Sequence, residues 1–388
     1  VEGNSFATIA TEADDVTVTL DANSKLKSDG QNHLAISVES EGNEITVTGV
    51  IEATNFLDGS TNVNANTIKV KAEYADELLA EGYTTTADDN GLVGVSGLAV
   101  AKIGETYYAT LADAATAAQS GETIQLIWAE GNGPISMAAT FVGNKTVTIT
   151  GTANVDWSKG WFFVGRGGEG DGHVIFDNAN LTSASNSTSL GFNVSGSKVS
   201  DNTTNDGTVE IKNSTIVLDY MLNKNVITLD NSTLTVKNGF SVTGRKASES
   251  ATGEDATATM TLSNNSKVVV NNMNGMGIGH EAYGIMNIDA TSTFETTQNF
   301  NISANGTMNN AGTVTINGTL TNNGTINFTD LAAKLTAQKD LTIVDKVNDP
   351  DYAIAYLDGT YQYAKYVAQI GEAKYLTLQE ALNAAQDG

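Results

Sequence analysis

Apolar and polar residues alternate along most of this chain in short runs separated by polar links. The alternation is clear in Val209-Glu210-Ile211, where two inward apolar positions flank an outward polar one. Period-two runs rich in Val, Ile and Thr predict strands, and links rich in Asn, Ser and Asp predict sharp bends. The strand–corner–strand copies lie at 149–155, 176–181, 211–216, 229–234, 262–268 and 288–294, with another at 20–26.

The first apolar anchors of the six successive copies lie 27, 35, 18, 33 and 26 residues apart. One short repeat among others lengthened by loops predicts a β-solenoid, whose turns stack at about 4.8 Å and bury their inward side chains. A Gly-Thr-apolar hexad then recurs at Gly306, Gly312, Gly318 and Gly324. Three hexads would make an 18-residue turn of a left-handed triangular β-helix, whereas pairs of twelve residues fit a narrow right-handed coil, so this stretch leaves the handedness open.

A 22-residue segment occurs twice, at 100–121 and at 367–388, with matching positions 267 residues apart. The first copy predicts a helix at about 110–120 with Thr110 as its N-cap, and an apolar strand follows it. The apolar face of this helix would consist of Leu111, Ala114, Ala115 and Ala118. Because the first turn of a solenoid exposes unpaired backbone and core side chains, we expect the helix to cover it.

The duplication predicts a piece of a longer tandem array. Residues 1–98 are expected to hold the last rungs and closing segment of a preceding unit, and 99–366 a complete unit. Residues 367–388 would then be the cap helix of a following unit. The complete unit is expected to comprise the cap helix at about 110–120, rungs at about 122–328 and a closing segment at 330–366.

The first copy also carries a family resemblance. The arrangement Tyr108-x-Thr110-Leu111-x-x-Ala114-x-x-Ala117-Ala118-x-x-Gly121, leading into Glu122-Thr-Ile-Gln-Leu, resembles the N-terminal cap of pectin-lyase-like right-handed parallel β-helices. It is similar, too, to the start of β-helix units in large tandem-repeat surface proteins of bacteria. The resemblance implies an all-β fold, a right-handed parallel β-helix with short N-terminal capping helices, at an extracellular or bacterial cell-surface location. A left-handed β-helix is the alternative for the hexad stretch.

Composition narrows the classes of partner. The chain has 45 Asp and Glu against 20 Lys and Arg, a net charge of −25 and a pI near 4.3. Such a surface repels phosphate backbones and anionic headgroups, so binding to nucleic acid or a membrane surface is not expected. Without cysteine there are no disulfides and no thiolate metal sites. No apolar run reaches the roughly 18 residues of a membrane span.

The richest candidate binding loop joins two of the three tryptophans to one of only two arginines. Exposed Trp faces stack on sugar rings, while Arg, Asp and Glu supply directional hydrogen bonds. The alternative is that the aromatic rings pack beneath the loop and its glycines only form turns. The predicted ligand-binding residues are Trp157, Trp161, Arg166, Glu169 and Asp171.

Calcium is the only metal that the loops predict, and no cofactor is required. Glu169 with Asp171, and Asp201 with Asp206, offer hard oxygen ligands in loops. None of these pairs follows the twelve-residue spacing of an EF-hand calcium loop.

Three functions follow from this reading. The favoured one is a structural and adhesive tandem-repeat protein, a stiff stalk or fibre that binds glycans or mucins through its loops and contacts neighbouring repeat units or other subunits. A polysaccharide lyase is an alternative. It would need a basic residue to take the proton next to a uronate and calcium or arginine to neutralise the carboxylate, and the complete unit offers only Arg166 and Arg245, with Lys246 beside the second. A hydrolase would need paired carboxylates, and the strands contain no adjacent acidic pair, so we assign no catalytic residue. A purely architectural surface-layer or filament subunit is the third.

Overall fold

The structure is a computed structural model of the 388-residue chain, and it is all-β with a large, mostly parallel sheet, as predicted. It describes residues 2–3, 7–28, 34–38, 40–53, 55–57, 63, 66–80, 83–128, 133–137, 140–165, 170–195, 206–249 and 253–385. The chain divides into two compact units, Val1–Ala114 and Ala115–Gly388, which are described separately.

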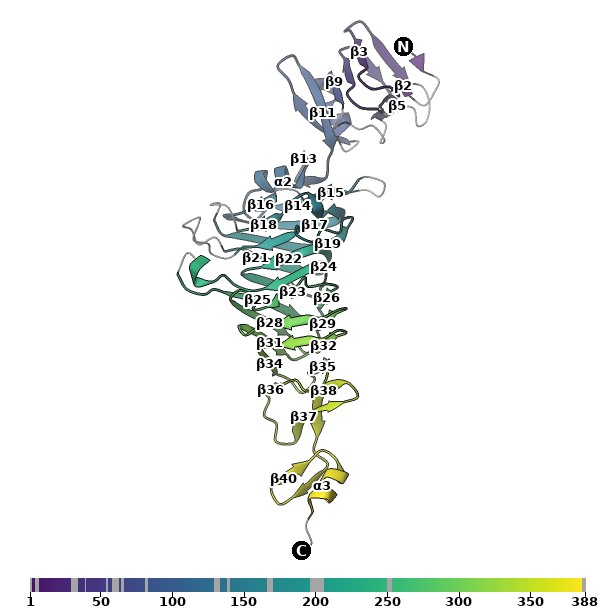
Figure 1. The fold of residues 1–388 in the computed structure, drawn as a ribbon. Coiled ribbons are helices and arrows are strands. Elements are labelled where there is room, and N and C mark those ends of the chain that lie inside the picture. The colour runs from purple at the N-terminus through teal and green to yellow at the C-terminus, as the bar shows by residue number, and fades with distance from the viewer. Residues whose placement is uncertain are drawn as a thin grey trace. The chain divides into compact units, whose positions relative to one another are not determined.

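In the second unit the chain winds into a β-solenoid (Figure 1), and a typical turn contributes one short parallel strand to each of three faces. Four long strands bend at a corner and so serve two faces. Face 1 consists of β14 (Thr123–Leu126), the first halves of β17 (Lys145–Asp156) and β19 (Gly172–Ser183), β21 (Thr208–Lys212), β23 (Val226–Asp230), β25 (Thr257–Ser263), β28 (Tyr283–Ile288), β31 (Gly306–Asn310), β34 (Thr325–Phe328) and β36 (Val344–Asp345).

Faces 2 and 3 complete the three-sided coil. Face 2 consists of β15 (Ile135–Ser136), the second halves of β17 and β19, the first halves of β22 (Thr215–Asn223) and β24 (Thr233–Val242), β26 (Lys267–Val270), β29 (Thr293–Thr296), β32 (Thr313–Ile316) and β35 (Lys334–Thr336). Face 3 consists of β16 (Thr140–Val142), β18 (Phe162–Val164), β20 (Phe192–Val194), the second halves of β22 and β24, β27 (Gly277–Ile278), β30 (Phe300–Ile302) and β33 (Leu320–Asn322).

The strand register on face 1 confirms the spacing of the apolar anchors. The residues paired in successive rungs are Ile149, Phe176, Ile211, Leu229, Leu262 and Ile288. One anchor on face 2 differs from the prediction, because Leu181 pairs with Ala153 and not with Val155. The register shifts at Gly151, whose positive φ of 100° and close approach to the Leu126 carbonyl explain why glycine stands there.

The hexad stretch forms a complete three-stranded turn of 18 residues from β31 to β34. Met308 of β31 pairs with Ile326 of β34, and β32 and β33 lie between them in sequence. The alternative of twelve-residue turns is therefore wrong, because three hexads are needed to return to the same face. The handedness of the coil stays a prediction.

Inward side chains fill the solenoid with an apolar core that includes layers of aromatic rings. The rings of Phe162 and Phe192 stack with centroids 5.3 Å apart, and Phe176 packs edge-on against Phe192. A second group of rings lies further along the coil and consists of Phe240, Phe294 and Phe300. Rings that pack on one another along the solenoid axis exclude water from its narrow core.

A ladder of buried serines lines the corner between faces 1 and 2. The Oγ of each serine accepts the backbone N–H of the residue at the same corner one rung earlier. The ladder runs from Ala179 through Ser214, Ser232, Ser266 and Ser292, with N···Oγ distances of 2.9, 3.0, 3.2 and 3.1 Å. These hydroxyls satisfy N–H groups that the bend removes from the strand ladders.

Beside the serines, asparagines take a left-handed backbone conformation in successive rungs. Asn213, Asn231 and Asn264 have φ values of 48°, 47° and 53°. The Asn231 side-chain amide donates to Asn213 Oδ1 at 2.9 Å. Because asparagine tolerates this conformation better than most residues, the corner explains the Asn-Ser pairs in the links.

The helix α2 (Leu111–Ala117) lies before the first rungs. Thr110 Oγ1 accepts the Asp113 N–H at 3.0 Å, as expected of an N-cap. At the other end, Lys145 of β17 donates its ammonium to the carbonyls of Ala115, Thr116 and Ala118. A cation on these terminal carbonyls also complements the helix dipole.

An antiparallel hairpin follows the last rungs of the second unit. Its strands are β37 (Tyr352–Leu357) and β38 (Thr360–Lys365), and β38 pairs antiparallel with β35. The Tyr363 hydroxyl donates to Asp345 Oδ1 at 2.5 Å, and burial together with this bond raises the pKa of Tyr363. A small hairpin, β39 (Ala368–Ile370) with β40 (Ala373–Tyr375), and the helix α3 (Leu378–Ala384) come next.

The first unit also has rungs followed by a hairpin, but two short helices lie between them that have no counterpart in the described part of the second unit. Three short parallel sheets form its rungs: β1 (Glu2–Gly3), β4 (Lys25–Ser28) and β7 (Val50–Glu52); β2 (Ala7–Thr11), β5 (Leu34–Val38) and β8 (Asn55–Leu57); β3 (Thr17–Leu20), β6 (Glu44–Val47) and β9 (Thr67–Lys71). The helices η1 (Ala72–Tyr74) and α1 (Ala75–Ala80) follow. An antiparallel hairpin, β10 (Tyr83–Ala87) with β11 (Leu92–Leu98), then pairs with β9, as β38 does with β35. The hairpin β12 (Ala101–Ile103) with β13 (Thr106–Tyr108) precedes α2.

Candidate functional site

The predicted binding loop is only partly described. Arg166, Glu169 and Asp201 lie outside the described residues. Trp157, Trp161, Asp171 and Asp206 are described: Trp157 lies in the core, Trp161 is partly exposed, and the two aspartates line one hollow.

The structure places Trp157 in the core, which corrects its assignment as a ligand-binding residue. Its side chain is fully buried, and its indole N–H donates to the Val217 carbonyl at 3.0 Å. A ring with both faces packed and its only donor satisfied has nothing left to offer a sugar. Trp157 begins the short helix η2 (Trp157–Lys159), so the second reading of the sequence, in which the aromatic packs beneath its loop, holds for this residue.

Trp161 keeps part of its ring accessible. It packs against Phe163 and Tyr220, with ring centroids 5.9 and 5.8 Å away. The Phe162 N–H donates to the Gly191 carbonyl at 2.9 Å, which places the backbone next to Trp161 close to Leu190 and Gly191. Trp161 is therefore the tryptophan of the predicted pair that can still contact a ligand.

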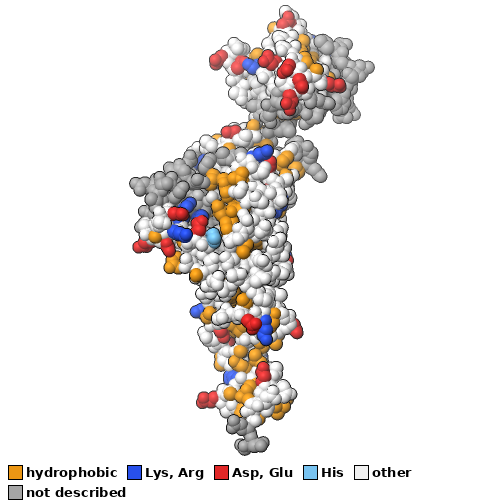
Figure 2. Space-filling model, in the orientation of Figure 1, with side chains coloured by type: hydrophobic (Ala, Val, Ile, Leu, Met, Phe, Trp, Pro, Cys, Tyr) orange, Lys and Arg blue, Asp and Glu red, His pale blue; other side chains and the backbone are white. Residues whose placement is uncertain are grey.

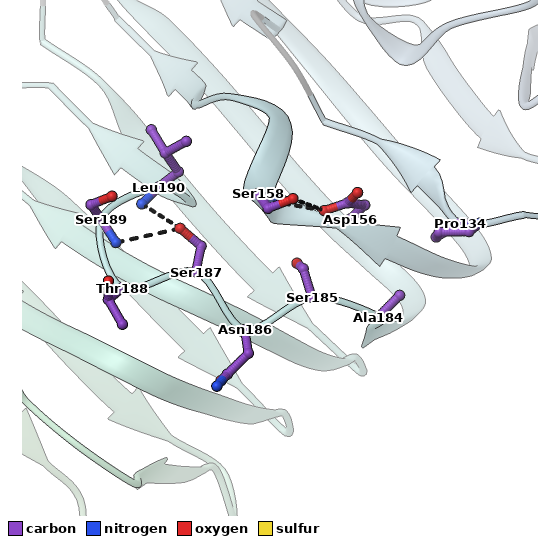
Figure 3. Close-up of a pocket in the computed structure, with 10 residues that line it drawn as sticks. All are labelled: Pro134, Asp156, Ser158, Ala184, Ser185, Asn186, Ser187, Thr188, Ser189 and Leu190. Carbon is purple, nitrogen blue, oxygen red and sulfur yellow. Dashed lines mark hydrogen bonds between the residues drawn. The ribbon is translucent and has the colours of Figure 1, made fainter.

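A polar groove of about 620 Å³ lies beside the Trp157 turn (Figure 3). The end of β17, the helix η2 and the connection between β19 and β20 form it. Side chains with hydroxyl, amide and carboxylate groups dominate the wall. The lining residues are Pro134, Asp156, Ser158, Ala184, Ser185, Asn186, Ser187, Thr188, Ser189 and Leu190.

One carboxylate of the groove is held in its charged form. Burial by itself would raise the pKa of Asp156, but hydrogen bonds from the Ser158 hydroxyl at 2.6 Å and the Ser158 N–H at 2.8 Å outweigh burial and lower it. Asp156 is thus an acceptor fixed at the edge of the groove, which is the kind of group that fixes the orientation of a hydroxyl-rich ligand.

An ion pair between a buried aspartate and a partly exposed lysine holds the long connection of the groove in place. Asp219 is completely buried and accepts the hydroxyls of Ser183 and Ser185, at 2.5 and 2.6 Å, and the Ser187 N–H at 2.6 Å. Lys237 Nζ lies 3.4 Å from Asp219 Oδ1 and donates to the Ser185 carbonyl at 2.5 Å. The groove wall is therefore pre-organised by a satisfied polar network.

Our sequence reading missed this support, although the sequence contains a signal for it. Asp219 and Lys237 are 18 residues apart, the length of the shortest rung, and Leu218 pairs with Val236 directly before them. An acid and a base at one corner of consecutive rungs therefore face each other.

Two of the predicted calcium ligands come together in a second hollow of about 420 Å³, on the outside of face 1. The Asp206 N–H donates to Asp171 Oδ1 at 2.8 Å. Lys145 also lines the hollow, and its ammonium donates to the carbonyls at the end of α2. Over the described part of the chain, His, Asp and Glu nowhere gather in a group of three that could hold a metal ion.

An ion-pair group lies on face 1 next to this hollow. His173 Nε2 lies 3.2 Å from Glu210 Oε1, and the Lys212 ammonium contacts the other Glu210 oxygen. The hydrogen bond from Lys212 is the largest effect on the pKa of Glu210 and lowers it, against a smaller rise from burial. The Glu210 carboxylate is thus shared between His173 and Lys212, although His173 Nε2 makes no hydrogen bond, and we interpret the group as a structural one.

A third polar group bears on the lyase alternative. Lys224, whose side chain is 9% exposed, pairs with Glu281, and burial lowers its pKa while Glu281 opposes the shift. The positive charge of Arg245 is a further influence that lowers it. A buried lysine with a lowered pKa, close to an arginine, could act as a general base in a lyase. Here the Lys224 ammonium is paired with the Glu281 carboxylate, which favours its protonated form.

The visible surface of the second unit is mostly neutral and polar, and its charged side chains gather in small groups (Figure 2). Among the described residues, no helix has the length and apolar character needed to cross a bilayer. No family model matches the chain, and neither the curated proteins nor the solved structures include a significant match to it.

Proposed function

We propose that this chain is part of an extracellular, bacterial cell-surface protein whose solenoid units serve as a stiff stalk and as an adhesive surface. The observation that carries the proposal is the repeated order of elements: rungs, closing hairpin, small hairpin and helix occur twice. Units of one design arranged in series extend a chain without adding a new fold. We further propose that the units are relatives of the pectin-lyase-like right-handed β-helices that the cap sequence resembles.

Stiffness would come from bonds that run along the coil. Parallel strands link each rung to the next, and the serine and asparagine ladders add bonds at one corner. Bending the stalk would require many of these bonds to lengthen together. Such a body suits a spacer that holds a binding surface away from the cell.

Adhesion is assigned to the groove beside the Trp157 turn. Its hydroxyl, amide and carboxylate groups match the hydroxyls of a neutral glycan, and the part-exposed ring of Trp161 lies near its Leu190 end. An open, polar wall favours weak contacts repeated along an array, so that avidity supplies the strength.

The test is retention of the chain on a panel of mucins and neutral polysaccharides, with and without calcium, while newly formed sugar ends are recorded. The groove variant is Asn186→Ala with Thr188→Ala, since both side chains are exposed. The matched control is Thr321→Ala with Asn323→Ala, two exposed residues on and beside β33. We expect retention without cleavage, weakened at least about tenfold in the groove variant and unchanged in the control.

Other outcomes would favour the alternatives. Newly formed sugar ends would support a polysaccharide lyase or hydrolase and direct attention to Lys224 and Arg245. If no glycan is retained, the purely architectural role remains and the groove has no adhesive function. Trp157→Ala is unsuited to this test, because removing a fully buried ring would disturb the fold itself.

A further inference from the structure

The two copies of the repeated segment fold in the same way. In the first, Ala101 pairs with Tyr108 and Ile103 with Thr106; in the second, Ala368 pairs with Tyr375 and Ile370 with Ala373. Each hairpin leads into a seven-residue helix, α2 or α3. Each described residue of the second copy, up to Ala385, therefore has a structural counterpart 267 positions earlier.

The copies differ in how far their apolar faces are buried. Leu111 of α2 is 0% exposed, whereas its counterpart Leu378 of α3 is 64% exposed. Ala115 is 1% exposed, and its counterpart Leu382 is 61% exposed. Exposed leucines one turn apart on a helix form an apolar face without a cover.

The first copy shows what covers such a face. The end of α2 lies against the first rungs: the Gly121 N–H donates to the Thr146 carbonyl at 2.7 Å, and the Thr148 N–H donates to the Glu122 carbonyl at 3.0 Å. The Lys145 ammonium bonds to the terminal carbonyls of the helix. A solenoid rung therefore lies at the end of the helix whose apolar face is buried, and it brings a cation to that end.

The helix α3 is fully formed although its two leucines are exposed. Thr377 Oγ1 accepts the Glu380 N–H at 3.1 Å, and Glu380 Oε2 accepts the Thr377 N–H at 3.1 Å, which is a complete capping box. Its exposed leucines are therefore held in one geometry, ready for a partner.

We propose that Leu378 and Leu382 of α3 form a docking face for the first rung of a following β-solenoid, one of the same kind as residues 122–156. This inference rests on the proposed tandem array and names its joint. The docking rung places a lysine or arginine at the carbonyls of Leu382, Asn383 and Ala385, as Lys145 does at their counterparts in α2.

The first experiment extends the full chain after Gly388 with a second copy of residues 122–366, so that α3 is followed as α2 is. Hydrogen exchange of the α3 amides is compared with the unextended chain. We expect exchange to slow by at least about tenfold in the extended chain. Leu382→Asp should abolish this protection, whereas Leu331→Asp, at a leucine 38% exposed elsewhere, should leave it intact.

A second measurement uses only the chain as it is. Ala115→Asp should speed exchange in β14 and β17 at least about tenfold, while Leu382→Asp, at the equivalent position, should leave all rungs unchanged. Unchanged exchange in Ala115→Asp would overturn the proposal, and so would unprotected α3 amides in an extended chain whose added rungs are folded. A dimer of the unextended chain that Leu382→Asp dissociates would also overturn it, in favour of a second copy as the occupant. None of these readouts depends on glycan retention.

Discussion

The serine ladder offers the sharpest test of what holds the rungs together. Ser232 is 3% exposed, and its Oγ accepts the Ser214 N–H at 3.0 Å while its own proton reaches the carbonyls of Asp230 at 2.7 Å and Ile211 at 2.9 Å. Ser232→Ala removes this oxygen and changes little else. The substitution leaves the Ser214 N–H buried without an acceptor, and water has no access to the corner.

The size of the effect follows from that orphaned donor. A buried N–H without an acceptor costs about 1–3 kcal/mol. Loss of the bond that the hydroxyl donated adds to this cost, but the carbonyls of a strand corner retain other donors. We therefore expect the free energy of unfolding to fall by about 2 kcal/mol. This corresponds to a roughly 30-fold rise in the opening equilibrium of the rung.

Two measurements check this expectation. Urea unfolding gives the global free energy, and hydrogen exchange gives the protection of the Ser214 amide and its neighbours in the strands β21 and β23. Ser189→Ala is the matched control, since Ser189 is exposed and the same hydroxyl is removed. If Ser232→Ala stays within about 0.5 kcal/mol of the control, the ladder contributes nothing and the strand bonds alone hold the corner.

Three further predictions concern the polar groups of the second unit. Asp219→Asn should destabilise the chain by about 3 kcal/mol, because two hydroxyls and an N–H lose a fully buried charged acceptor and Lys237, 26% exposed, loses its counter-ion. Urea unfolding measures this, and an unchanged midpoint would contradict it. Glu281→Gln should destabilise by at most about 3 kcal/mol by leaving Lys224 buried and unpaired. The addition of Lys224→Met should restore part of the loss, which a double-mutant cycle measures, and strict additivity would argue against the pair. The pKa of Glu210 is lowered in the folded state, chiefly by Lys212, so the stability that its charge contributes is present at neutral pH and is lost as the pH falls below the ordinary value of 4.5. The difference in unfolding free energy between the parent chain and Glu210→Gln should therefore shrink on acidification. A difference that does not change with pH would refute this prediction.

The rung repeat could be predicted from sequence because it depends on a short-range rule. Inward residues must be apolar in every rung, so Ile211 and Leu229 reveal their pairing by spacing alone. The rule fails where the backbone departs from even alternation. At Gly151 a bend with positive φ shifts the register, and the sequence then misplaces the partner of Leu181 by two residues.

The candidate site was harder to predict, because side chains of the same type have opposite roles in neighbouring positions. Trp157 and Trp161 are four residues apart, yet one is completely buried and the other keeps part of its ring accessible. What separates them is the course of the loop over the coil, which alternation does not encode. Composition alone therefore could not distinguish a core ring from a surface ring within the loop that it singled out.

The groove depends on a pairing that becomes visible only once the rung length is known. Asp219 interrupts an apolar strand, and in isolation a buried carboxylate there would be destabilising. The 18-residue rung brings Lys237 to the same corner. Asp219 then accepts three hydrogen bonds from Ser183, Ser185 and Ser187, and Lys237 donates two to Ser183 and Ser185, all at 3.0 Å or less. Once a solenoid's rung length is established, residues one rung apart become neighbours. Opposite charges at that spacing are then the places to look for loops that the coil holds rigid.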